Sequence, residues 1–286
     1  MAFVKILAPL TGGVQDAAVL TGAISAALPF GAHVAALFVR PDPALAMPFY
    51  GESVSGLVVQ EVMDASRETA DAAVTRARAA LQSIARTADI AVMDACEKRS
   101  APCISLREVT GNFADSVTQA ALLSDLVVFS APKDEERAGF SEAIEAVLLE
   151  ARRPVLLSAK PIAPGFHEKI AIGWNASVES AQAVSAALPL LKHAKTVEIL
   201  AVERADAPCA RCGELVEYLS LHAVSATARE IKAAERPVAD VLLEAASGSG
   251  LLVLGGYGHS RWRELFVSST TRQAITQADL PLFLVH

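Results

Sequence analysis

The sequence predicts an α/β protein made of two similar domains, each with a five-stranded parallel sheet between two layers of helices. Short apolar runs alternate with segments in which apolar residues recur at helical spacing. The order of these segments starts again after residues 160–167, which contain two prolines and a glycine. The length of 286 residues is sufficient for two domains of roughly 100–200 residues each. Because strands that alternate with helices form parallel sheets through right-handed crossovers, both copies should carry helices on both faces.

The first copy begins with an apolar run that ends at Pro9 and a glycine pair, which is typical of a buried strand before a turn. Asn112 stands directly before a segment of helical period and is a suitable N-cap. The expected strands are residues 3–10, 32–39, 104–109, 125–130 and 154–159, and the expected helices are residues 14–28, 57–87, 112–123 and 140–151.

The second copy repeats this order. The run KIAIGW from Lys169 resembles KILAPL from Lys5, and PVADVLLEAA from Pro237 parallels NFADSVTQAA from Asn112. We therefore predict an internal duplication, with a domain at 1–160, a linker at 161–167 and a domain at 168–286. The second copy is shorter mainly because it lacks the long insert after its second strand. Its expected strands are residues 169–174, 196–202, 226–231, 250–255 and 281–285, and its expected helices are residues 178–191, 214–223, 237–246 and 269–277.

The composition excludes several classes of protein. A hydrophobic fraction of 52% with 20% charged residues excludes general disorder. The 25 basic and 32 acidic residues give a net charge of −7, and without a basic block no nucleic-acid partner is expected. No apolar run reaches the length of about 18 residues that a membrane span needs. The absence of a charged leader, together with only four cysteines, makes a reducing cytoplasm the expected location.

The strongest local signal for a binding site follows the fourth strand of the second copy. Gly255 and Gly258 stand where the chain leaves the sheet, and glycine permits close approach of the backbone to a ligand. Residues 269–271 are hydroxylic and begin the last expected helix, where free N–H groups favour an anion. His259 and Arg261 in the loop between them would add positive charge. The pattern fits a phosphate cradle, and taken alone it also fits an ordinary glycine turn and helix cap.

These motifs resemble those of a tandem universal stress protein, with two such domains in one chain. Nucleotide-binding members of that family carry Gly-x-x-Gly, nine residues, and then Gly-Ser/Thr before the last helix. Here Gly255 and Gly258 match the first part, nine residues follow, and Ser269 matches the Ser/Thr, while Ser268 stands where the pattern has glycine. The resemblance covers essentially the whole chain. It implies the adenine-nucleotide α-hydrolase-like form of the three-layer sandwich in both domains.

The resemblance also implies an ATP site in the second copy, with or without Mg²⁺. The two motif glycines would donate N–H groups to the phosphates and ribose, and Ser269 would bind phosphate. Val202, at the end of the second strand, would face the adenine, and Asn175 stands where the family has an acidic residue. Trp174 would either stack on a base or, as we favour, pack against the core. The implied nucleotide-binding residues are Asn175, Val202, Gly255, Gly258, Ser268, Ser269, Thr270 and Thr271.

The first copy departs from this pattern. After its fourth strand it has no Gly-x-x-Gly, and Asp134, Glu135 and Glu136 stand near the expected phosphate position, where they would repel it. Thr11 occupies the position of the family's acidic residue. We predict that this copy does not bind nucleotide and packs on the second copy as a pseudo-dimer. Further association of two chains into a homodimer is left open.

The implied function is a stress-response protein in which ATP binding to the C-terminal domain acts as a regulatory switch. The sequence has neither the Gly-x-x-x-x-Gly-Lys-Ser/Thr loop nor a dinucleotide motif, so at most slow ATP hydrolysis is expected. One alternative is a nucleotide-free interaction scaffold, which Ser268 and Asn175 favour. A weaker alternative is a thiol-redox or metal sensor through Cys209 and Cys212, which form a single Cys-x-x-Cys without a second ligand pair. The sequence identifies no protein partner.

Overall fold

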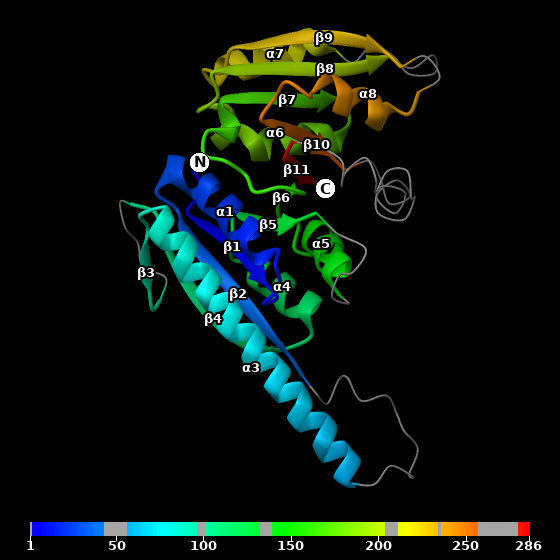
Figure 1. Ribbon diagram of the computed structural model, residues 1–286. Helices are drawn as coiled ribbons and strands as arrows, with labels where there is room; N and C mark the ends of the chain where they lie inside the picture. The colour runs from blue at the N-terminus through cyan, green and yellow to red at the C-terminus, as the bar shows by residue number, and fades with distance from the viewer. Residues whose placement is uncertain are drawn as a thin grey trace.

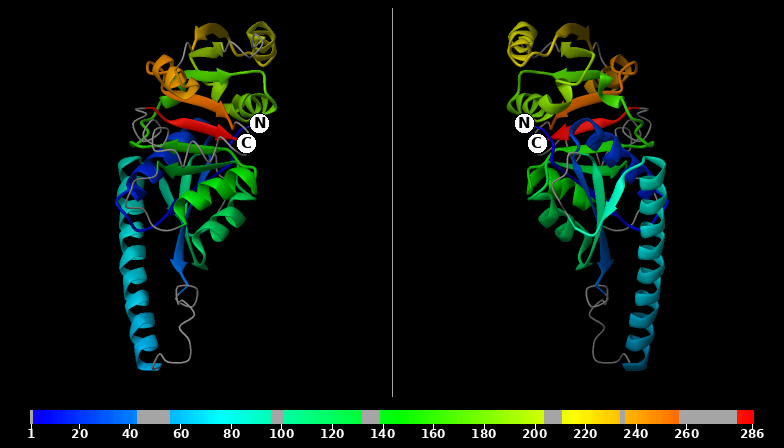
Figure 2. Two further views of the ribbon diagram at one scale, coloured as in Figure 1. Left: turned by 90° about the vertical axis from the view of Figure 1, so that its right-hand side faces the viewer. Right: turned by 90° about the vertical axis from the view of Figure 1, so that its left-hand side faces the viewer.

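The structure is a central β-sheet covered by helices on both faces (Figure 1). The computed structural model describes residues 2–42, 56–95, 101–131, 139–203, 211–233, 236–256 and 280–286, with the backbone alone for 56–59. Figure 2 shows the layers from two further sides, with α3 (Gly56–Thr87) on one face and α5 (Phe140–Leu149) on the other. The predicted α/β fold class is confirmed.

The described strands form a single sheet of eleven, in the order β3-β4-β2-β1-β5-β6-β11-β10-β7-β8-β9. Every neighbouring pair in it is parallel except β6 and β11, which are antiparallel. The strands are β1 (Lys5–Leu10), β2 (His33–Pro41), β3 (Ala91–Met93), β4 (Cys103–Gly111), β5 (Leu126–Ser130), β6 (Val155–Ser158), β7 (Lys169–Trp174), β8 (Thr196–Glu203), β9 (Ala226–Lys232), β10 (Leu251–Gly255) and β11 (Leu282–Val285).

The sheet contains the same strand order twice. We call β1–β6 the first half and β7–β11 the second half. The first half runs β4-β2-β1-β5-β6 after the extra strand β3, and the second half runs β9-β8-β7-β10-β11. In each half the first strand lies between the second and the fourth main strands. Eleven strands in two equivalent runs suggest two domains, as the repeated sequence pattern predicts.

The two halves are joined through their last strands. Phe283 of β11 lies opposite Leu156 of β6 and Val253 of β10, so the C-terminal strand is paired on both sides. The segment expected to be a linker also packs against the first half. Ile162 is 3% exposed, and its carbonyl accepts a hydrogen bond from the Ser25 hydroxyl at 2.7 Å. This segment therefore contributes to the core rather than only connecting two sheets.

The described helices follow the predicted positions closely, and the helix expected at 269–277 lies outside the described residues. The Asn112 side chain accepts a hydrogen bond from the N–H of Asp115, which confirms it as the N-cap of α4. In the described part of the chain, none of the helices is both long and apolar enough to cross a membrane. Besides α3 and α5, the α-helices are α1 (Asp16–Ala27), α4 (Phe113–Ala121), α6 (Val178–Leu191), α7 (Cys212–Leu221) and α8 (Val238–Ala245), and short 3-10 turns lie at Leu28–Phe30 and Phe166–Glu168.

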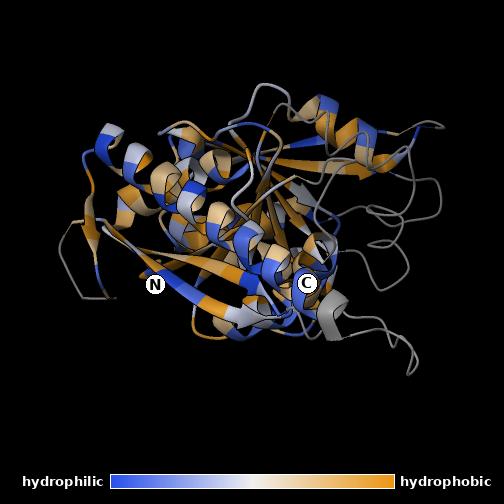
Figure 3. Cartoon of the chain, turned by 60° about the horizontal axis from the view of Figure 1, so that its bottom comes forward, coloured by the Kyte–Doolittle hydropathy of each residue, from blue (hydrophilic) through white to orange (hydrophobic). Residues whose placement is uncertain are grey.

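Two apolar clusters form the core, one on each face of the sheet. Because successive strand residues point to opposite faces, Ile6, Ala8 and Leu10 of β1 belong to one cluster and Leu7 to the other. Both clusters contain residues of both halves. Figure 3 shows strands that are mostly apolar and helices that carry both apolar and polar residues. The continuous apolar runs in the sequence reflect this burial from two sides.

One strand, β3, was missed by the sequence reasoning. It has three residues, pairs only with β4 among the described strands, and leaves Val92 51% exposed. A three-residue edge strand is too short to establish a period of two, and its exposure removes the apolar signal. It extends the sheet at the far side of the first half without changing the order of the main strands.

Candidate functional site

Three strands of the second half end side by side. The register pairs Leu254 of β10 with Gly173 of β7, and Trp174 of β7 with Ala201 of β8. The carboxyl ends of β10, β7 and β8 therefore form one edge of the sheet. The strand that follows β7 in the chain, β8, lies on one side of β7, and β10 lies on the other side. Ligands of open α/β sheets bind at this kind of switch point. The structure thus brings Asn175, Val202 and Gly255 to the same edge, as the strand order predicts.

The turn after β7 is held by its own side chains. Asn175 is exposed, and its Oδ1 accepts a hydrogen bond from the N–H of Ser177 at 3.1 Å. Ser177 in turn caps α6, because its hydroxyl oxygen accepts from the N–H of Ser180 at 3.2 Å. Ala176 between them has a left-handed backbone with φ of 57°. The Asn175 side chain therefore shapes this turn while remaining open to solvent.

Gly255 has a structural role that the sequence did not reveal. A Cβ at this position would collide with the backbone of Glu179 and Ser180 in the first turn of α6. The next residue, Gly256, donates its N–H to the carbonyl of Val285 at 2.6 Å. Glycine at 255 thus lets α6 pack directly on the end of β10. Donation of N–H groups from this turn to a phosphate stays a prediction.

Trp174 and Val202 lie on opposite faces of the sheet. Trp174 is half-buried and packs against the same apolar cluster as α6, in agreement with the packing interpretation. Val202 is half-buried against the other cluster and lies opposite Ile231 of β9. Their side chains support the sheet, so any contact with a base at Val202 would come from its backbone.

A carboxylate close to this edge was not anticipated. The pKa of Glu179 lies below its ordinary value, chiefly because its own backbone N–H donates a hydrogen bond to it, and also because of a hydrogen bond with Ser177 and the nearby His286. A negative charge in the first turn of α6 suits the positive end of the helix dipole. In the sequence, the carboxylate of Glu179 could have been expected at the helix start only from its place two residues after Ser177, the N-cap of α6. Its charge occupies part of the helix start beside Gly255.

The remaining residues of the predicted nucleotide motif lie outside the described residues. These are Gly258, His259, Arg261, Ser268, Ser269, Thr270 and Thr271. The acidic residues of the first copy, Asp134, Glu135 and Glu136, also lie outside them, as does Cys209. The other half of the Cys-x-x-Cys pair, Cys212, is buried at the start of α7. Among the described residues there is no group of three or more metal-binding side chains.

A buried polar cluster in the first half has no counterpart in the sequence reasoning. His33 Nδ1 lies 3.1 Å from Cys103 Sγ, and His33 Nε2 lies 2.8 Å from Ser105 Oγ. All three side chains are buried at the start of β2 and β4. Burial, with a smaller contribution from the charge of Lys5, lowers the pKa of His33. The residues are too far apart along the chain for spacing to predict this contact.

The lowered pKa of His33 predicts acid sensitivity. The unfolded chain takes up a proton on histidine at about pH 6.5, whereas the folded chain resists it until lower pH, so folding stability falls as the pH drops below that value. Chemical denaturation at about pH 7.5 and about pH 5.5 should show this loss in the wild type and a smaller loss in His33→Gln. An equal loss in both proteins would contradict the assignment. His167, whose pKa is also lowered by burial, requires His167→Gln as a parallel variant.

Several solved structures have an arrangement of strands and helices similar to that of this chain. No protein-family model and no curated protein matches the chain. A universal stress protein from Archaeoglobus fulgidus matches with a TM-score of 0.64 and 12% identity, over 98% of this chain and 95% of that chain. A functionally unknown protein from Pseudomonas aeruginosa matches with a TM-score of 0.52 and 10% identity, over 99% and 92% of the two chains.

A third structure gives the same result. A putative universal stress protein from Pseudomonas aeruginosa matches with a TM-score of 0.50 and 12% identity, over 99% of this chain and 93% of that chain. In each case the match spans nearly the whole of both chains, and the shared property is the arrangement of the strands and helices. This chain therefore has the fold of these universal stress proteins, with the matches covering 98–99% of its length.

Proposed function

We propose that this chain is a stress-response protein of the universal stress protein family that binds ATP in its second half as a regulatory switch. The observation that carries the proposal is the meeting of Asn175, Val202 and Gly255 at the carboxyl edge of β7, β8 and β10. The Gly-x-x-Gly sequence begins at that edge, and its spacing to Ser269 matches the family's nucleotide-binding motif. Fold alone does not fix function, so this conclusion depends on those residues.

Part of the described edge is open to solvent. Asn175 and Ala176 are exposed, so the turn after β7 leaves room for a ligand beside it. The Asn175 amide can hydrogen-bond a base or ribose, and the backbone at Val202 would border the base. The motif residues Gly258 and Ser269 would bind the phosphates. Bound ATP would order the loop of residues 256–267 and so change the surface offered to a partner.

The first half would serve as the internal partner of the second. Its last strand, β6, pairs in an antiparallel sense with β11, the last strand of the second half. We propose that this contact joins the domains 1–160 and 168–286 into a pseudo-dimer. Two single-domain chains related by a two-fold axis would join strands in the same antiparallel sense. In this chain the covalent connection makes that association permanent, and one nucleotide per chain is expected.

The test is the nucleotide content of the purified protein, followed by calorimetric titration of the stripped protein with ATP. We expect one ATP per chain. Gly258→Asp and Ser269→Asp should each weaken binding at least about tenfold, because a carboxylate would face the phosphates at short range. The matched control is Ser220→Asp, which adds the same charge at an exposed position of α7.

The alternatives give different results in the same experiment. Two nucleotides per chain would contradict the prediction for the first half. Unchanged affinity in Gly258→Asp and Ser269→Asp would mean that ATP binds elsewhere. No heat at millimolar ATP would favour the nucleotide-free scaffold, in which Ser268 and Asn175 have disabled the site.

A further inference from the structure

A row of aromatic rings connects the two halves where the N-terminus lies between them (Figures 1 and 2). Phe3, just before β1, stacks on Phe283 of β11 with ring centroids 6.5 Å apart. Phe3 also forms a T-shaped contact with Phe30, just before β2, at 5.2 Å. Phe30 in turn forms a T-shaped contact at 5.1 Å with His193, which follows α6. The row therefore contacts the second half at two places, at β11 and at the end of α6.

A second histidine extends this row. His167 lies in the 3-10 turn before β7, and its ring centroid is 6.3 Å from that of His193 and 5.4 Å from that of Phe166. Phe166 is 7% exposed and belongs to the same apolar cluster as Phe3 and Phe283. The two histidines are therefore the titratable members of a mainly apolar contact. We call the following six residues the ring row: Phe3, Phe30, Phe166, His167, His193 and Phe283.

The surroundings of His167 disfavour a proton on its ring. Its Nδ1 is buried and has no hydrogen-bond partner among the described residues. Burial lowers the pKa of His167, and the nearby His193 lowers it further, whereas Glu168 acts in the opposite direction. Glu168 is itself paired with Lys195, whose Nζ lies 2.7 Å from its Oε2. The carboxylate that acts on His167 is thus already shared with a cation.

The other charged side chains close to the two histidines in the chain are basic. Lys192 is the C-cap of α6, Lys169 begins β7, and both are exposed. The turn Leu28–Phe30 is uncharged, as are residues 246–250, which approach Phe166 through Gly250. Among these neighbours, only Glu168 would oppose the charge of an added proton.

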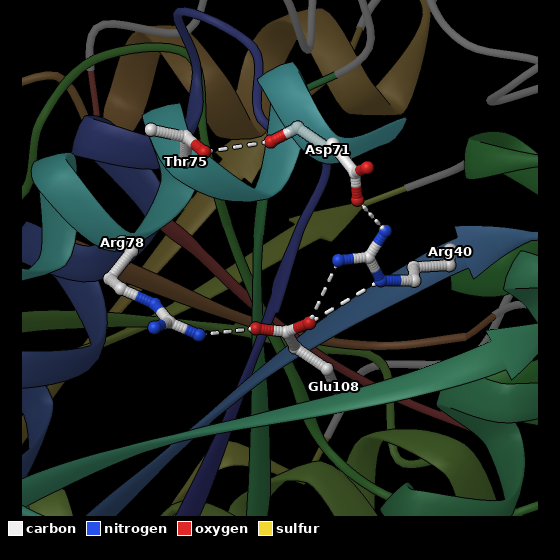
Figure 4. A network of polar contacts seen from close by, with 5 residues as sticks. All are labelled: Arg40, Asp71, Thr75, Arg78 and Glu108. Atoms are coloured by element: carbon white, nitrogen blue, oxygen red, sulfur yellow. Dashed lines mark hydrogen bonds and ion pairs between the residues drawn. The ribbon is translucent and has the colours of Figure 1, made fainter. Parts of the chain in front are cut away.

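The charged cluster of the first half is built differently (Figure 4). Arg40 of β2 donates to Asp71 of α3 and, at 3.3 Å, to Glu108 of β4. Glu108 also accepts from Arg78 of α3 at 2.6 Å. Each charge in this cluster therefore has a partner of opposite sign. Carboxylates and guanidinium groups ordinarily keep their charges between about pH 5.5 and about pH 7.5, so α3 should not respond to mild acid.

We propose that the ring row is an acid-sensitive joint between the two halves. With uncharged histidines the rings pack together, whereas a proton on His167 places a charge in a buried site beside His193 and opens the contact. The strands β6 and β11 contain no titratable side chain, so their antiparallel pairing keeps the halves connected while the joint opens. This device goes beyond the proposed function, because its ligand is the proton and it needs no nucleotide.

Hydrogen–deuterium exchange of the whole protein without nucleotide tests the joint. If only the open joint takes up the proton, at the ordinary histidine pKa of about 6.5, opening becomes about tenfold more favourable between about pH 7.5 and about pH 5.5. The reporters are the amides of Glu168 and Lys195, which donate to the carbonyls of Gly165 and Glu168. After correction for intrinsic exchange, their protection should fall about tenfold, while the amides of α3 around Arg78 keep theirs.

Two substitutions of His167 identify the titrating group. His167→Phe keeps a ring beside Phe166 but takes up no proton, so the two amides should have the same protection at both pH values. His167→Gln is also uncharged and should give the same result. The matched control is His222→Phe, because His222 also contacts an aromatic ring, that of Tyr218 at 4.7 Å, but lies outside the ring row. This variant should keep the wild-type response to pH.

Three results would overturn the proposal. The first is a wild-type response to pH in both His167 variants. The second is unchanged protection of the Glu168 and Lys195 amides in the wild type at about pH 5.5. The third is an equal loss of protection in α3, since acid would then unfold the whole protein rather than open a joint. Because no nucleotide is present, a failed ATP titration leaves these results intact.

Discussion

Replacing Gly255 with alanine is expected to lower the free energy of unfolding by about 3 kcal/mol, because the added Cβ collides with backbone atoms that cannot rotate away. Side-chain neighbours give way by changing rotamer, whereas the neighbours here are the main chain of Glu179 and Ser180 at the start of α6. To make room, α6 would have to move off β10 and β11, against which it packs in the core of the second half. The melting temperature should fall by roughly 5–10 °C.

The matched control for this prediction is Gly248→Ala. No atom lies within 4 Å of the place that a Cβ would take at Gly248, and the backbone there is not left-handed. Alanine should therefore leave stability within about 0.5 kcal/mol of the wild type. Thermal and denaturant unfolding of both variants, followed by far-UV circular dichroism, would measure the difference. Equal stability of the two variants would mean that α6 does not lie against Gly255 as the structure has it.

Because Gly255 has this packing role, the ATP affinity of a Gly255 variant cannot show whether the residue contacts the nucleotide. A Gly255 variant that loses ATP affinity would do so even if the residue never touches phosphate, because α6 and the turn after β7 would shift with it. Gly258 and Ser269 are therefore better probes of the proposed site. The same caution does not apply to Asn175, whose side chain is exposed and forms its hydrogen bond within its own turn.

The fold could be predicted from the sequence because most helices and strands have a regular local pattern of apolar residues. The helix expected at 57–87 is observed at Gly56–Thr87, and the helix expected at 178–191 is observed with those bounds. The strand order explains why Asn175, Val202 and Gly255 meet, since the rule that ligands bind at strand ends needs only the order of elements. The short exposed strand β3 was missed because it has no periodicity to read.

Contacts between distant parts of the chain could not be predicted in this way. Arg40 and Glu108 lie on different strands, and Asp71 lies on a helix between them, so nothing local indicates that the three meet. The same holds for His33 and Cys103. Gly12 and Gly255 are a further example of contacts that could not be predicted from the sequence. A glycine before a turn predicts backbone freedom, but only the structure shows that Gly12 and Gly255 are needed because a helix backbone lies against each of them.

Replacing Asp16 with alanine is expected to destabilise the protein by about 3 kcal/mol, because the buried N–H of Gly12 and the partly buried N–H of Thr11 lose a charged acceptor, and hydrogen bonds to charged groups contribute about 1.5–3 kcal/mol each. Asp16 is 2% exposed, so water cannot easily replace the carboxylate. The loss should appear in denaturant unfolding as a lower midpoint with an unchanged slope.

The control separates this hydrogen bonding from the general effect of an acidic residue at a helix start. Asp115 also lies in the first turn of a helix, α4, but is exposed, so Asp115→Ala should cost no more than about 1 kcal/mol. Asp16→Ser provides the second comparison, since serine occupies the corresponding position, Ser180, in the second half. The Ser180 hydroxyl donates to the main-chain carbonyl of Ser177. A serine at position 16 would donate to the Gly13 carbonyl in the same way and leave the N–H groups of Thr11 and Gly12 without a carboxylate acceptor, so serine should not restore stability. If Asp16→Ala and Asp115→Ala lower the free energy of unfolding equally, the buried carboxylate does not hold the turn after β1.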